Sequence, residues 1–292
     1  MARSLADAGF VVIAYDRLGY GRSPYTGIGG PDALTVTAQQ SALHDLVTAL
    51  HAGSYQLGRA LCRPGDPGIR TTYASSRVAL IGHSAGGFVV SSYPGRYHDV
   101  VAMVQANAPS GLQSLTPPGN AAITSVIGGQ SSPPHGAGDD RYGTVGDSRQ
   151  DRQPPAAPRG YGYVPGPDRV PCEEFTLWRP TAVREVATVM CAPQASAATP
   201  EGEGNSYYWQ APPNNALIRQ TGAIPVLLAG GDHDVIMPGD ANALELSAWK
   251  GACGCDVSQF VLTDTAHAFM AHDTLPQWID HAVTWLHAEK VR

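Results

Sequence analysis

The segment IGHSAGGFVV, Ile81–Val90, decides the fold. The apolar run that enters it, Arg77–Gly82, is typical of a buried parallel strand, and the residues after Ser84 favour a helix. Gly82 and Gly86 flank the serine in a G-x-S-x-G pattern, which suits a strand that turns sharply into a helix. Such a turn exposes the serine hydroxyl beside a helix N-terminus, which favours developing negative charge. We therefore predict that Ser84 is a nucleophile, and the alternative is a serine that only caps a helix.

Further strands and helices alternate along the chain. The helices are expected near residues 2–8, 35–53, 241–249 and 275–289. Apolar, β-branched runs predict further strands at Phe10–Asp16, Val100–Ala106, Ile224–Gly231 and Val257–Asp264. This alternation predicts an α/β fold, with a mostly parallel sheet covered by helices on both faces.

A serine nucleophile needs a base, because a hydroxyl at its free pKa is a poor nucleophile. The sequence TDTAHAFMAHD offers His267 and His272 directly after the last predicted strand. We predict His267 as the base, because it is nearer the strand end in a loop of small residues, and expect His272 on the following helical segment. His83 is adjacent to Ser84, so its side chain should point away and pack or hydrogen-bond within the turn.

The base in turn needs a carboxylate to orient it. The sequence GGDHDVIMP, after the strand at Ile224–Gly231, offers Asp232 and Asp234. We choose Asp234 over Asp232, and the alternative for either is a turn aspartate that binds its own backbone. The chain order is then Ser84, Asp234, His267, which is the order expected for the α/β-hydrolase fold.

Three motifs carry a resemblance to a known family: YDRLGYGRSP, GHSAGG, and GGDHDVIMP followed by TAHAFM. With them the chain resembles the serine esterase and lipase-like branch of the α/β-hydrolase superfamily, over Met1–Ala106 and about Ile224–Arg292. The resemblance implies a hydrolase core at 1–106 and 223–292, an oxyanion-hole amide at Ala85, and no cofactor. It gives Asp16 a structural role. A serine at position 84 also separates the chain from dehalogenase and epoxide hydrolase branches, which use aspartate.

The segment between the third and fourth predicted strands, residues 107–222, differs from the rest. It is rich in proline, glycine and aromatic residues, so we expect neither sheet nor long helix there, only short helices at 173–178 and 181–190. A long structureless insertion in a domain is improbable unless it is functional or disordered. We predict a partly irregular cap or lid over the site, which is where the family places its cap; the alternative is a loosely structured insertion.

The beginning of the chain departs from the family pattern. The family fold starts with further strands, and a loop after one of them, which often begins His-Gly, supplies a second oxyanion amide. The sequence from Met1 onward contains no match to these strands or to this loop. We expect an N-terminally truncated hydrolase, and the competing explanation is a shortened, inactive descendant. The opening MARSLADAGF lacks the apolar core of a signal peptide, but truncation could have removed one, so the localisation stays open.

Composition excludes several classes of partner. The net charge of −6 and a pI near 5.9 argue against nucleic-acid or anionic-membrane partners, and no apolar run reaches the roughly 18 residues of a membrane span. Five cysteines without C-x-x-C pairs argue against a zinc site, and we expect no metal. Cys172 and Cys191 either pair in an oxidising compartment or remain separate thiols.

These observations predict a serine hydrolase that cleaves a small or medium carboxylic ester or related acyl compound through an acyl-enzyme. Two alternatives stay open. The same Ser-His pair could perform other chemistry, such as C–C hydrolysis, cyanohydrin cleavage or cofactor-free peroxidation. The chain could also be a binding protein that keeps the pocket without turnover.

Overall fold

The computed structural model describes residues 1–20, 23, 30–55, 72–110, 161–163, 176–190, 198–200, 211–234, 237, 240–289 and 291. Among these residues no helix is both long and apolar enough to cross a bilayer. The described strands are β1 (Ala79–His83), β2 (Ala102–Ala106), β3 (Tyr161–Tyr163), β4 (Ala198–Pro200), β5 (Pro225–Gly231) and β6 (Asp256–Leu262). The described helices are α1 (Ala2–Asp7), η1 (Gly30–Ala33), α2 (Val36–Ala52), α3 (Ala85–Ser91), α4 (Tyr93–Tyr97), α7 (Arg184–Met190), α9 (Ala211–Ile218), α10 (Ala241–Ala252), η4 (Phe269–Ala271) and α11 (Leu275–Ala288).

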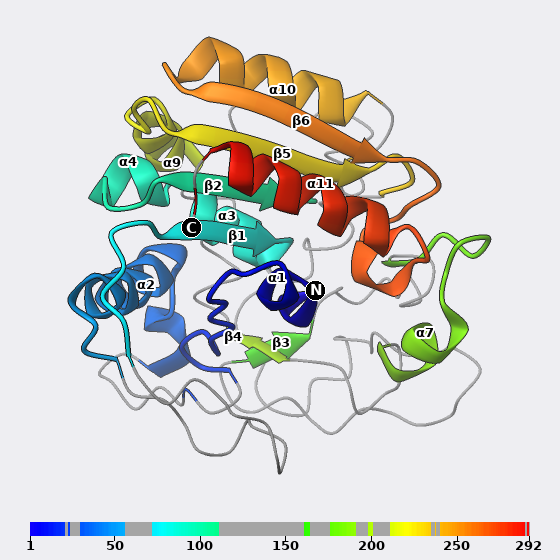
Figure 1. Ribbon diagram of the computed structural model, residues 1–292, viewed down its shortest axis with the longest axis horizontal. Coiled ribbons are helices and arrows are strands. Elements are labelled where there is room, and N and C mark those ends of the chain that lie inside the picture. Colours follow the sequence, from blue (N-terminus) through cyan, green and yellow to red (C-terminus); the bar gives the residue numbers. More distant parts are fainter. Residues whose placement is uncertain are drawn as a thin grey trace.

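The main sheet has four parallel strands in the order β1-β2-β5-β6. Its register aligns Ile81 with Val104 and Val104 with Leu227. All four strands run the same way, so their carboxyl ends, at His83, Ala106, Gly231 and Leu262, lie along one edge of the sheet (Figure 1). Ligands of open α/β sheets bind outside this edge, and the loops that follow these strands therefore define the candidate site.

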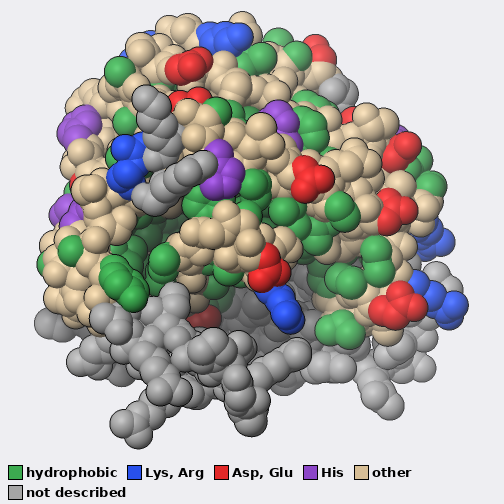
Figure 2. Space-filling view, in the orientation of Figure 1, with side chains coloured by type: hydrophobic (Ala, Val, Ile, Leu, Met, Phe, Trp, Pro, Cys, Tyr) green, Lys and Arg blue, Asp and Glu red, His purple; other side chains and the backbone are tan. Residues whose placement is uncertain are grey.

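Helices cover both faces of the sheet, as the alternation of elements predicted. On one face, residues of α2, α3, α4, α9 and α10 pack with Leu80, Met103 and Val226 of the strands. On the opposite face, Trp278 and Ala282 of α11 pack against the neighbouring strand positions, such as Val104 and Leu227. Figure 1 shows α11 and α1 on one side of the sheet and α3 on the other. In the same view, charged side chains are scattered among polar and hydrophobic ones (Figure 2).

Helix α2 shows how local sequence sets the boundaries of an element. Thr35 precedes the helix, and its hydroxyl accepts a hydrogen bond from the Ala38 N–H at 3.2 Å. The helix ends at Gly53, which adopts a left-handed conformation with φ of 64°. Leu43 and Val47, four residues apart, face the core and are buried. The helix predicted over 35–53 is thus confirmed.

The strand predicted at Phe10–Asp16 is wrong. These residues form no β-ladder in the described part of the chain. Phe10 and Val12 pack against a buried cluster that includes Leu5 and Leu286, whereas Val11 stays 58% exposed. The side chains alternate between core and solvent as in a strand. A β-strand also needs a neighbouring strand that accepts and donates backbone hydrogen bonds, and the apolar pattern of the sequence does not show whether such a neighbour is present.

The range 107–222 contains more sheet than its proline content predicted. Tyr161–Tyr163 and Ala198–Pro200 form a short antiparallel ladder, β3 with β4. The helix predicted over 181–190 is present as α7, which begins at Arg184, and half of the one predicted at 173–178, residues 173–175, lies outside the described residues. Proline at the end of a short edge strand such as β4 is compatible with pairing, because an edge strand leaves half of its N–H groups unpaired.

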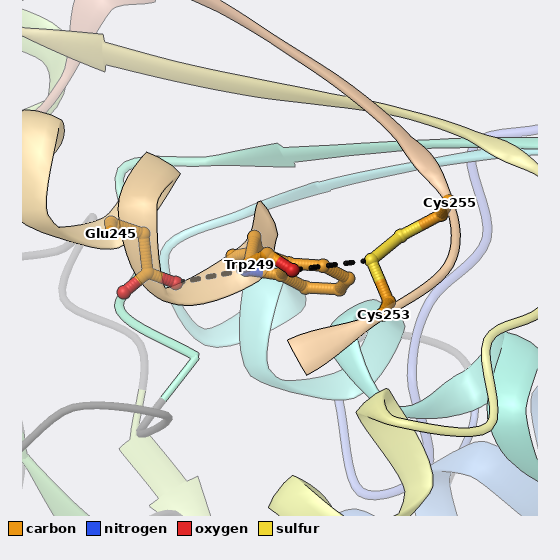
Figure 3. Close-up of a disulfide and its surroundings, with 4 residues drawn as sticks. All are labelled: Glu245, Trp249, Cys253 and Cys255. Atoms are coloured by element: carbon orange, nitrogen blue, oxygen red, sulfur yellow. Dashed lines mark hydrogen bonds between the residues drawn. A yellow bond between two sulfur atoms is a disulfide. The ribbon is translucent and has the colours of Figure 1, made fainter. Parts of the chain in front are cut away.

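A disulfide joins Cys253, which caps the end of α10, to Cys255 (Figure 3). This C-x-C pair was not predicted, because a single residue separates the two cysteines and the usual cysteine motifs have the C-x-x-C spacing. Cys62, Cys172 and Cys191 lie outside the described residues. Cys253 and Trp249 belong to the same buried cluster, so this bond lies at the edge of the core.

Glu245, one turn before Trp249 on α10, is a buried carboxylate at 2% exposure. Its Oε1 atom accepts hydrogen bonds from Trp249 Nε1 at 3.0 Å, from the Ser110 N–H at 2.7 Å and from Gln105 Nε2 at 3.2 Å (Figure 3 shows the first). These donors neutralise part of the cost of burying a carboxylate. Glu245 therefore fastens the loop after β2 to α10.

Candidate active site

Ser84 lies at the junction of β1 and α3 in a backbone conformation that non-glycine residues rarely adopt, with φ of 53° and ψ of −120°. Such conformations persist only where the surroundings enforce them, and they cluster at functional sites. The turn is tightly packed: a Cβ atom on Gly82 would lie 2.3 Å from the Gly86 carbonyl oxygen, and one on Gly87 would lie 2.4 Å from the Ala108 side chain. Close approach therefore requires glycine at both positions, and for Gly82 this agrees with the tight turn that the sequence predicted.

The structure brings together the three side chains predicted from the sequence. Ser84 Oγ lies 2.8 Å from His267 Nε2. His267 Nδ1 lies 3.1 Å from both carboxylate oxygens of Asp234. The hydroxyl therefore donates to an imidazole whose Nδ1–H donates to a carboxylate.

Burial isolates the inner pair of this arrangement from water. The side chain of His267 is 4% exposed and that of Asp234 is fully buried. Asp234 follows β5, and His267 follows β6 in the loop of residues 263–274, which we call the His267 loop. A carboxylate beside an imidazole in a dry environment favours the tautomer with the proton on Nδ1, and it stabilises the imidazolium when a proton arrives at Nε2.

Two side chains hold the backbone of His267. His83 Nε2 and Asn107 Nδ2 each lie 2.8 Å from the His267 carbonyl oxygen, so both donate to it. Burial, with a smaller contribution from the neighbouring His267, lowers the pKa of His83 to about 4, against weaker opposing effects from this hydrogen bond and from Asp234. His83 is thus neutral at pH 7, and its ring bonds to the His267 loop and not within its own turn, where its hydrogen bond was expected. Asn107 was not predicted from the sequence, where its position directly after β2 is the available signal.

The two competing candidates for the triad have other partners. Asp232 Oδ1 accepts from the Thr265 N–H at 3.2 Å, so this carboxylate fastens a turn of the His267 loop. His272 lies between η4 and α11 rather than on a helix, and its Nε2 accepts from the Trp178 N–H at 2.9 Å. Neither residue bonds to Ser84 or His267 through its side chain in the described structure.

Ala85, the predicted oxyanion donor, is the first residue of α3. Its N–H group is one of those that a helix N-terminus leaves without an intrahelical acceptor. The N–H groups of Gly87 and Phe88, further along the same turn, return to the Ser84 carbonyl oxygen at 2.8 and 3.4 Å. Within the described residues no three His, Cys, Asp or Glu side chains are grouped as metal ligands would be.

This chain belongs to the alpha/beta hydrolase family, whose model matches residues 1–279. Its likeness to solved structures extends over nearly its whole length at low sequence identity. A monoacylglycerol lipase from Paleococcus ferrophilus is 16% identical, with 98% of this chain and 87% of the lipase covered and a TM-score of 0.57.

Two further structures carry different activities in their names. A bromoperoxidase from Bacillus anthracis is 20% identical, with 98% and 84% covered and a TM-score of 0.56. Epoxide hydrolase A from Mycobacterium thermoresistibile is 19% identical, with 98% and 85% covered and a TM-score of 0.56. No curated protein matches the chain. At these identities the likeness establishes the fold, the family supports a hydrolase-like enzyme, and the reaction must be argued from the site itself.

Proposed function

We propose that this protein is a serine hydrolase that cleaves a small or medium carboxylic ester through an acyl-enzyme, with Ser84, His267 and Asp234 as its triad. The observation that supports the proposal best is the continuous hydrogen-bonded chain from Ser84 Oγ through His267 to a fully buried Asp234. The strained backbone of Ser84 adds support, because it presents the hydroxyl at the carboxyl edge of the sheet.

In the proposed reaction, Ser84 Oγ attacks the ester carbonyl carbon while His267 Nε2 takes the hydroxyl proton. Asp234 holds the imidazolium, and the Ala85 N–H stabilises the oxyanion. The tetrahedral intermediate expels the alcohol, to which His267 returns the proton. Water then attacks the acyl-serine with His267 as the base, which releases the acid and restores Ser84.

We further propose that part of the range 107–222 forms a cover over this site. Residues 176–183 support this, because their backbone bonds to the His267 loop at three places. The acyl-chain length that the enzyme accepts would then depend on this range as well as on the core.

Labelling with a fluorophosphonate probe tests the proposed triad directly. We expect a covalent adduct on Ser84, located by peptide mass spectrometry, and no adduct on the Ser84→Ala protein. A panel of p-nitrophenyl esters of increasing acyl length then tests the substrate class. A folded but unlabelled protein would contradict the proposal, and labelling without ester turnover would favour another Ser-His chemistry on the same residues.

A further inference from the structure

His272 is a buried histidine that the proposed mechanism does not use. Its side chain is enclosed at 2% exposure, and both of its ring nitrogens are occupied. Nδ1 lies 2.9 Å from the Ala268 carbonyl oxygen, so it carries the proton and donates. Nε2 accepts from the Trp178 N–H at 2.9 Å and from the Ala266 N–H at 3.4 Å. His272 therefore joins a segment of the inserted range to the backbone on either side of His267.

Backbone bonds extend this attachment along residues 176–183. The Ala268 N–H donates to the Thr176 carbonyl oxygen at 2.9 Å, and the Val183 N–H donates to the Ala271 carbonyl oxygen at 2.8 Å. The Asp273 N–H donates to the Thr181 carbonyl oxygen at 2.8 Å. Apolar contacts reinforce these bonds, since Leu177 packs against Ala268 and Ala271 in one buried cluster.

Trp178 also reaches residues 232–234, which follow β5 and which we call the Asp234 loop. Its ring stacks on that of His233, with the ring centroids 3.6 Å apart and the planes at 4°. His233 immediately precedes Asp234. One residue of the inserted range thus binds the His267 loop through its backbone and the Asp234 loop through its ring.

We infer that His272 is a positioning residue: it fastens residues 176–183 across the His267 and Asp234 loops, so that this segment is a fixed wall of the site. The inference rests on the proposed function, because it assumes that His267 and Asp234 serve Ser84. Its physical basis is that the Trp178 N–H of the segment and the Ala266 N–H of the His267 loop share His272 Nε2 as their acceptor. Without that acceptor the Trp178 and Ala266 N–H groups lose this partner, so the attachment of the segment to the loop is weaker and opens more often.

Two substitutions separate the acceptor from the volume of the side chain. His272→Leu removes the acceptor, and His272→Gln keeps an oxygen that can reach the position of Nε2. Val189→Ala, at a 70% exposed position of α7, is the matched control. The readouts are the second-order rate of Ser84 labelling, kcat and KM for an ester substrate, and hydrogen exchange of peptides covering 176–183.

We expect His272→Leu to lower the labelling rate and kcat by roughly ten- to a hundred-fold, since small misplacements of catalytic groups have effects of this size. KM should change less than kcat, and exchange at 176–183 should become faster. His272→Gln should restore the labelling rate to within about three-fold, because it restores the acceptor. If His272→Leu labels as fast as the control while 176–183 exchanges faster, the positioning role is refuted; unchanged exchange refutes the attachment.

Trp178→Ala keeps the inference testable if His272→Leu fails to fold. This variant removes the stack on His233 and leaves His272 in place, so it should also speed exchange at 176–183 and slow labelling. A wild-type protein that is not labelled at all would instead refute the proposed function, and the exchange comparison would still decide whether His272 holds the segment.

Discussion

Acidification should destabilise this protein through His83. In the folded chain, burial holds the pKa of His83 at about 4, whereas an unfolded histidine titrates near 6.5. The folded pKa is depressed, so the stability that the neutral imidazole contributes is complete above pH 6.5 and is lost as the pH falls toward 4. Because each pH unit in this window corresponds to about 1.36 kcal/mol, the loss is about 2 kcal/mol at pH 5 and about 3 kcal/mol at pH 4.

A glutamine at position 83 tests this reasoning, because its amide can donate to the His267 carbonyl oxygen but does not titrate. We would measure urea unfolding by tryptophan fluorescence at pH 7.5, 6, 5 and 4.5. Between pH 7.5 and 5, the free energy of unfolding of the wild type should fall by about 2 kcal/mol more than that of His83→Gln. His98→Asn, at an exposed position with φ of 54° that asparagine tolerates, should instead follow the wild type. Parallel pH profiles for the wild type and His83→Gln would refute the assignment of His83 as neutral in the folded protein.

Three other substitutions test the site and its support. Asp234→Asn should lower kcat/KM for an ester by about 10⁴-fold, because the amide favours the wrong imidazole tautomer. Asp232→Asn keeps its bond to the His267 loop, so its kcat/KM in the same assay should stay within about ten-fold of the wild-type value. Gly82→Ala should abolish labelling of Ser84 and lower the melting temperature, since its Cβ would lie 2.3 Å from a backbone oxygen; normal labelling would contradict the packing argument. Glu245→Leu removes the acceptor that three N–H donors share and should cost about 3–5 kcal/mol in urea unfolding, whereas Glu245→Gln keeps one oxygen and should cost less; equal losses would show that hydrogen bonding is not the cause.

The sequence predicted the family, the parallel sheet and which side chains would meet, because these depend on local signals. The glycine-flanked Ser84 specifies its own turn, and the positions of Asp234 and His267 after strands place them at one edge of a parallel sheet. Their distances could be measured only in the structure, and their catalytic role stays a prediction.

What the sequence could not predict depends on contacts between distant segments. The alternating pattern of Phe10–Asp16 fits a strand, but only tertiary pairing decides whether a ladder forms, and none does in the described chain. Asn107 and His272 act through hydrogen bonds to the backbone of other segments, and the sequence around each residue does not show which segment it will meet. The Cys253–Cys255 bond was likewise missed, because one residue separates the partners and no usual spacing flags it.

The two donors on the His267 carbonyl oxygen have a practical consequence. Since His83 and Asn107 anchor the peptide unit itself, the location of the imidazole does not depend on the serine hydroxyl. A Ser84→Ala protein should therefore keep His267 and Asp234 in place without the nucleophile. Incubated with a mixture of candidate esters, it would retain an uncleaved compound, and the mass of that complex in native mass spectrometry would identify the ester that the site selects.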